Sequence, residues 1–112
     1  MGRSQRTKGQ SGERELAGIL QDRLGGTVRR ALGQERDGGA DIQSEGSPLS
    51  GWAIQVKRVE ALSLGRAWRQ AEADAGSRRP VVAHRANGGS WCFYVRLTAD
   101  EFCQMVREIG DD

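Results

Sequence analysis

The chain has 112 residues, with 17 Lys and Arg against 15 Asp and Glu, so its formal net charge is only +2. This length suits one domain with a single core, and the two cysteines are too few for a disulfide scaffold or a zinc site. Because no apolar run approaches the ~20 residues that span a bilayer, we expect a cytoplasmic protein with no membrane partner.

The charges are unevenly distributed along the chain. Residues 1–30 carry seven basic and three acidic side chains, whereas residues 98–112 carry one basic and five acidic side chains. This distribution suits a protein that presents one basic face to a phosphate backbone. A solvated surface of mixed charge explains it equally well.

The N-terminal third of the chain contains one predicted helix. Residues 1–10, MGRSQRTKGQ, are polar and basic and predict a flexible arm. Residues 11–112 form the expected single domain. Apolar residues at helical spacing predict a helix that Ser11 caps and that ends at Leu24, before Gly25 and Gly26.

The predicted strands and helices alternate through the rest of the chain. Three strands, over residues 27–31, 40–43 and 52–58, form an expected antiparallel meander. A helix between Ser63 and Gly76 follows, then strands over residues 80–84 and 91–97, and a closing helix that the capping box of Thr98 and Glu101 begins. The order α-β-β-β-α-β-β-α predicts an α/β fold, with a central mixed sheet of about five strands flanked by helices.

The stretch GWAIQVKR, residues 51–58, joins core and polar residues on one strand. Side chains alternate along a strand, so Gln55 and Lys57 lie on one face. The other face carries Trp52, Ile54 and Val56. One face is therefore core, and the other ends in an amide and an amine.

Two carboxylates are candidates for the same site. Glu13 falls on the apolar stripe of the first helix, where it needs a metal or a basic partner, although a frayed first turn also favours negative charge. Asp41 follows Gly38 and Gly39, which allow close backbone approach. An acid on one strand and an oxygen donor and a lysine on the next can converge on Mg²⁺, with the lysine orienting an attacking water.

These motifs resemble the PD-(D/E)xK nuclease superfamily. KGQSGEREL, residues 8–16, is similar to the KGxxxEREL opening of archaeal-type Holliday-junction resolvases. RDGGADI followed by IQVKR is similar to Mrr-like endonucleases, in which glutamine stands where Glu or Asp is usual. The resemblance covers residues 8–58 with specific motifs and is weak beyond residue 91.

The resemblance implies a restriction-endonuclease-like core and a metal-dependent DNA endonuclease that hydrolyses phosphodiester bonds. The implied metal ligands are Glu13, Asp41 and Gln55, with Lys57 as the catalytic lysine and Mg²⁺ or Mn²⁺ as the cofactor. A homodimer that acts on four-way DNA junctions is also implied.

Basic residues near these motifs are the expected DNA contacts. The resemblance implies a role for Arg14 and for one of Arg29 and Arg30. Arg6 and Lys8, from the basic arm, are phosphate contacts or simply part of a solvated tail.

Alternative functions stay open. The chain could cut linear or modified DNA, as Mrr-like enzymes do. It could also bind DNA without cutting, because Gln55 brings no charge and should lower metal affinity. Related nucleases can place a glutamine near the site from the second helix, but Gln70 is interpreted as a solvent-facing helix amide. His84 is interpreted as a satisfied edge histidine rather than a general base.

Overall fold

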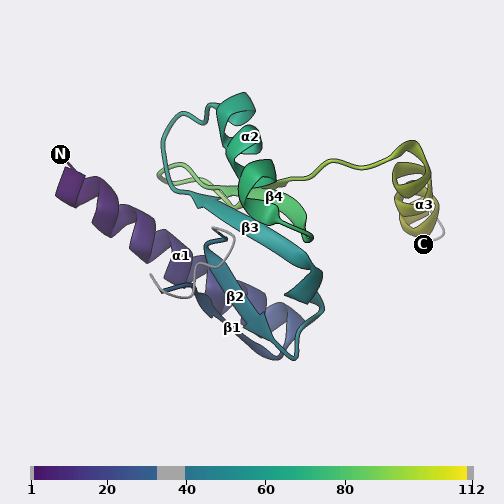
Figure 1. Cartoon of the computed structure of the whole chain (residues 1–112), viewed down its shortest axis with the longest axis horizontal. Helices are drawn as coiled ribbons and strands as arrows, with labels where there is room; N and C mark the ends of the chain where they lie inside the picture. The colour runs from purple at the N-terminus through teal and green to yellow at the C-terminus, as the bar shows by residue number, and fades with distance from the viewer. Residues whose placement is uncertain (1, 33–39, 111–112) are drawn as a thin grey trace.

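The computed structural model describes residues 2–32 and 40–110, with side chains from Lys8 onward, and shows a mixed α/β fold. Its elements are α1 (Gly2–Leu24), β1 (Thr27–Arg30), β2 (Ile42–Glu45), the 3-10 helix η2 (Pro48–Gly51), β3 (Trp52–Lys57), α2 (Leu64–Ala75), β4 (Arg79–His84), β5 (Cys92–Tyr94) and α3 (Ala99–Gly110) (Figure 1). Within the described ranges, no helix combines the length and apolarity needed to cross a bilayer.

The five strands form two small sheets rather than the expected central sheet. β1 and β2 pair antiparallel, while the second sheet has the order β3-β4-β5, with β3 and β4 parallel and β4 and β5 antiparallel. The predicted meander is interrupted between β2 and β3. Asp41 donates its backbone N–H to the Ile54 carbonyl, but the next N–H on the same edge of β3, that of Val56, bonds to the Asp41 side chain. In a continuous sheet this N–H would instead bond to a backbone carbonyl of the neighbouring strand.

The predicted start of the first helix is wrong. α1 begins at Gly2 rather than at Ser11, so the backbone of the expected flexible arm is helical over residues 2–10. Arg, Gln and Lys are good helix formers, and a polar segment can continue a helix whose apolar face is packed further along. Gly38 and Gly39, and the side chain of Arg6, lie outside the described residues.

The ends of the other two helices agree with the sequence prediction. α2 lies between Ser63 and Gly76, which has a positive φ of 62°. At α3 the capping box is confirmed, since Glu101 donates its N–H to Thr98 Oγ1 at 3.1 Å and Thr98 donates its N–H to Glu101 Oε1 at 2.9 Å. A side-chain cap therefore marks the start of α3 and a glycine the end of α2, whereas Ser63 makes no side-chain cap hydrogen bond at the start of α2.

The sheet of β3 and β4 separates two packing regions. Ile54 belongs to an apolar cluster that includes Leu16 of α1, whereas Ala53 packs with Ala75 of α2. The predicted alternation along β3 is confirmed. Gln55 and Lys57, which share the face of Ala53, are thereby turned toward α2 (Figure 1).

Candidate functional site

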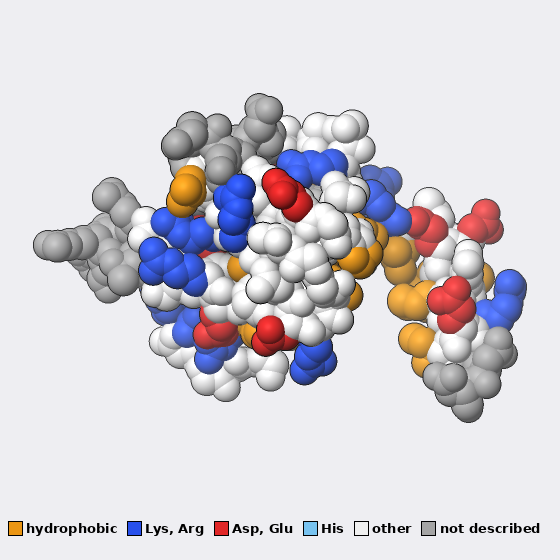
Figure 2. Space-filling model, turned by 90° about the horizontal axis from the view of Figure 1, so that it is seen from below, with side chains coloured by type: hydrophobic (Ala, Val, Ile, Leu, Met, Phe, Trp, Pro, Cys, Tyr) orange, Lys and Arg blue, Asp and Glu red, His pale blue; other side chains and the backbone are white. Residues whose placement is uncertain are grey.

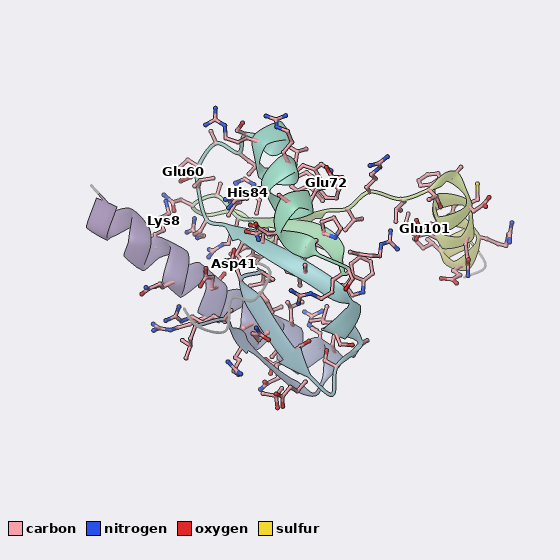
Figure 3. All side chains as sticks on the ribbon, viewed as in Figure 1. Lys8, Asp41, Glu60, Glu72, His84 and Glu101 are labelled. Carbon is pink, nitrogen blue, oxygen red and sulfur yellow. The ribbon has the colours of Figure 1, made fainter. Side chains whose placement is uncertain are left out.

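Asp41 connects the two sheets and lies at the centre of the candidate site. Its side chain is 6% exposed, and its Oδ2 accepts the N–H of Val56 at 2.8 Å. Its backbone N–H donates to Ile54 and its carbonyl accepts the N–H of Ala31. Figure 3 labels Asp41 beside β3. Because Val56 lies between Gln55 and Lys57, the carboxylate lies against the backbone that carries both side chains.

Helix α2 holds the two polar side chains of β3. Gln55 is 3% exposed and donates its Nε2 to Asp74 Oδ2 at 3.3 Å, and Lys57 donates its Nζ to Gln70 Oε1 at 2.9 Å. Gln70 and Asp74 are four residues apart and so lie on one face of α2. Since the amide nitrogen of Gln55 is turned to Asp74, its carbonyl oxygen, the atom that can bind a metal, is directed away from Asp74.

The sequence indicated only part of the contribution of α2. Gln70 is exposed, as predicted, and it also accepts a hydrogen bond from Lys57, as the alternative interpretation allows, whereas the motifs gave no indication of Asp74. The available signal was their four-residue spacing beside the alanine stripe of α2, which the structure packs against the sheet.

Glu13 has the basic partner that its burial requires. The side chain is nearly buried, and its Oε1 lies 3.6 Å from Nη1 of Arg30 on β1. Arg30 is the register partner of Ile42, the residue after Asp41. An arginine of β1 therefore links the glutamate of α1 to the strand end that carries Asp41.

A close approach of α1 brings Glu13 to the end of β3. A Cβ atom added at Gly12 would lie 3.1 Å from Cβ of Arg58, so the helix backbone passes directly beside the residue that follows Lys57. Glycine permits this approach because it has no side chain. The structure thus places α1, next to Glu13, beside the carboxyl end of β3, where Val56 contacts Asp41 and Lys57 extends toward α2.

Basic side chains surround this end of the strand. A cleft of about 470 Å³ is lined by Lys8 and Gly9 of α1 and by residues 56–60, which include Lys57 and Arg58. A neighbouring cleft of about 200 Å³ is lined by Lys57, Gln70 and Arg66, among others. Lys57 therefore lies between two clefts that carry positive charge. Figure 2 shows that Lys and Arg side chains also gather on one face of the body of the molecule.

The other predicted DNA contacts differ in their surroundings. Arg14 is exposed on α1, and Arg29 is exposed on β1, whereas Arg30 is occupied by Glu13. His84 ends the central strand β4 rather than an edge strand, and its Nε2 contacts the Val59 carbonyl at 2.7 Å, so the ring has the partner that the sequence analysis expected. Arg29 is thus the more exposed of the two candidate arginines of β1.

The donor atoms at the site fit a hard divalent cation. Glu13 and Asp41 supply carboxylate oxygens and Gln55 supplies a carbonyl oxygen, which are ligands of the type that Mg²⁺ prefers. Glu13 would have to share its carboxylate with Arg30 or release it. Among residues 2–32 and 40–110, no three His, Cys, Asp or Glu side chains are grouped as metal ligands.

The comparisons with known proteins supply no relative. No protein-family model matches the chain, and no significant similarity to a curated protein or to a solved structure was found.

Proposed function

We propose that this chain is a metal-dependent DNA endonuclease with a restriction-endonuclease-like core. The observation that carries the proposal is the hydrogen bond between the Asp41 carboxylate and the N–H of Val56, between Gln55 and Lys57. The element order supports the core: a helix, three strands, a second helix and a strand parallel to the third.

The site residues have separate roles in this proposal. Glu13, Asp41 and Gln55 would hold Mg²⁺, with Mn²⁺ as a substitute. The metal would supply Lewis-acid chemistry at the scissile phosphate and would lower the pKa of an attacking water. Lys57, held at its Nζ by Gln70, places a positive charge where negative charge develops on the phosphate. Asp74 keeps the Gln55 amide in the orientation that directs its oxygen away from α2.

The basic residues around the site would bind the DNA backbone. Lys8, Lys57 and Arg58 line one cleft together with a single carboxylate, Glu60, so a phosphate in this cleft would meet a net positive charge. Arg14 and Arg29 extend the basic surface on α1 and β1. A four-way junction is the proposed preferred substrate, and linear or modified DNA is the alternative.

A DNA-binding module without nuclease activity is the second candidate function. The ion pair between Glu13 and Arg30 favours it, because an arginine already neutralises one of the two carboxylates in the ligand set. Both candidate functions predict that the chain binds DNA, but only the nuclease predicts that it cuts DNA. Cleavage therefore has to be measured beside binding.

The proposal is tested with a labelled four-way junction and a linear duplex of the same sequence, each with Mg²⁺, Mn²⁺ or EDTA. Lys57→Met removes the positively charged side chain of the site. Arg107→Met, the matched control, removes a positively charged side chain from the exposed helix α3. We expect Lys57→Met to slow cleavage about 100-fold or more, as for loss of one charge-stabilising group. Asp41→Asn, which keeps an oxygen for the Val56 N–H but loses the charge, should also be inactive.

The outcomes separate the candidates. Paired, metal-dependent cuts at the junction would support a resolvase, and cuts in both substrates a less selective nuclease. DNA binding without cutting under any metal would favour the binding module. Absence of binding to either DNA would overturn both.

A further inference from the structure

Helix α3 carries an apolar face that is not packed. Phe102, Met105, Val106 and Ile109 have the i, i+3, i+4, i+7 spacing of one helix face. All four are exposed, Ile109 by 67%, and none of the described residues of α3 is buried. An isolated helix of this length is marginal in water. The exposed face therefore indicates a docking element.

The body of the molecule carries an apolar groove of matching character, which we call the α2–β5 groove. It has a volume of about 430 Å³ and is lined by Leu64, Trp68, Phe93, Tyr94, Val95 and Arg96. Trp68 and Tyr94 pack on buried residues of α2 and β4, so the hydrophobic core supports the floor of the groove. Leu64, Phe93 and Val95 are each more than 40% exposed. A groove of this kind suits the apolar face of a helix.

The connection between β5 and α3 keeps the helix away from the groove of its own chain. Residues 95–98 separate the two elements. Arg79 donates from Nη2 to the Arg96 carbonyl at 2.9 Å and also forms an ion pair with Glu101, so one side chain holds both ends of the connection. Figure 1 shows α3 standing apart from the body, and Figure 2 shows apolar side chains on the side of α3 toward the body.

The charges around the two surfaces are complementary. The described residues of α3 include three carboxylates and one guanidinium, and one of these carboxylates, Glu101, is already paired with Arg79 of its own chain. The groove has Arg96 in its wall, and the adjoining helix α2 carries Arg66 and Arg69 on its exposed surface. Glu72, which pairs with Arg96, only partly offsets them. An acidic helix and a basic rim attract each other, and two copies of this chain would each bring both.

We propose that α3 of one copy docks its apolar face in the α2–β5 groove of a second copy, and that the exchange is reciprocal in a twofold-symmetric dimer. Symmetry gives each dimer two identical contacts and covers both exposed apolar surfaces. The connection before α3 is short and is fixed by Arg79, so α3 cannot easily fold back onto the groove of its own chain. Such a connection favours exchange of the helix between two chains. The proposal does not depend on the nuclease function, and its test contains no DNA.

The test is the oligomeric state of the whole chain by sedimentation velocity over a wide range of concentration. Ile109→Lys changes the apolar face of α3, and Leu64→Lys changes the groove. Gln104→Lys is the control, because residue 104 lies on the opposite face of α3 and already contacts Glu108. We expect a wild-type dimer whose Kd rises at least about 30-fold for Ile109→Lys and for Leu64→Lys but not for the control.

Mixing the two dimer-breaking variants identifies the contact. A mixed dimer of Ile109→Lys with Leu64→Lys retains one intact helix–groove contact, whereas each homodimer retains none. We therefore expect the mixture to associate more tightly than either variant alone. A wild-type monomer at every concentration would overturn the proposal. So would a dimer that Leu64→Lys leaves unchanged, or a mixture that associates no better than its components.

Discussion

Replacing Gln55 by Glu should turn a stabilising contact into a repulsive one. Gln55 Nε2 lies 3.3 Å from Asp74 Oδ2, and Gln55 is 3% exposed. Glutamate has nearly the same shape, so the introduced carboxylate would occupy the same space. Two carboxylates would then face each other where an N–H donor now meets an acceptor.

The size of the effect is limited by protonation. At the 3.3 Å separation of the present contact, two unit charges repel by about 5 kcal/mol at an effective dielectric constant of about 20, and by about 1 kcal/mol in water. A carboxyl of ordinary pKa, about 4.3, can instead take up a proton, at a cost of about 4 kcal/mol at pH 7 and about 1 kcal/mol at pH 5. The protonated group again donates to Asp74.

The sign of the pH dependence follows from this limit. The introduced carboxyl has a higher pKa in the folded state than in the unfolded state, so the variant loses stability as the pH rises above about 4.3. We expect the free energy of unfolding to fall by about 2 to 4 kcal/mol at pH 7, and by about 1 kcal/mol at pH 5.

Urea unfolding without metal, followed by far-UV circular dichroism at both pH values, measures this loss. The matched control is the double variant Gln55→Glu, Asp74→Asn, in which an amide donor again faces an acceptor. Its stability should return to within about 1 kcal/mol of wild type. Wild-type stability of Gln55→Glu at pH 7, or a loss that Asp74→Asn does not relieve, would refute the contact between Gln55 and Asp74.

Three further outcomes follow from particular contacts. Gly26 has a φ of +70°, and an added Cβ would lie 2.5 Å from a backbone oxygen, so Gly26→Ala should lose more than about 3 kcal/mol in urea unfolding. Gly25→Ala, with a φ of +79° but no described atom within 4 Å of the added Cβ, should lose about 1 kcal/mol. A hydrogen bond from a backbone N–H, and then an arginine, hold the pKa of Glu101 below its ordinary 4.5. This stabilisation is present above pH 4.5 and is lost as the pH falls below it, so NMR should show the helicity of α3 decreasing in that window. Gln70→Ala removes the hydrogen bond that positions Lys57. On the proposed function it should slow cleavage about 10-fold, whereas Gln104→Ala on α3 should leave cleavage unchanged.

Each of these outcomes has a result that contradicts it. Equal losses for the Gly26 and Gly25 variants would mean that the added Cβ meets no obstacle. A decrease in α3 helicity with acid that persists in Glu101→Gln would assign the effect to another group. Cleavage unchanged by Gln70→Ala, with Lys57→Met inactive, would mean that the lysine needs no positioning by α2.

The sequence by itself determined the local features of this protein. Thr98 and Glu101 cap α3 because each side chain bonds to the backbone of the other, and Gly76 ends α2 because its positive φ suits glycine. The alternation along β3 places Gln55 and Lys57 on one face, as the spacing predicted. These outcomes depend on interactions among neighbours in the chain, so a pattern of residue types is enough to predict them.

The tertiary structure decided which distant residues these helices and strands contact. Asp41 accepts the Val56 N–H with its side chain at the point where the two sheets meet, and α2 supplies Asp74 and Gln70 as partners for the β3 side chains. These contacts join residues 13 to 19 positions apart. Their geometry depends on how whole elements pack, and the same local pattern would fit a continuous sheet. The exposed face of α3 shows this limit most clearly, because its amphipathic pattern predicts a packed helix but does not identify its partner.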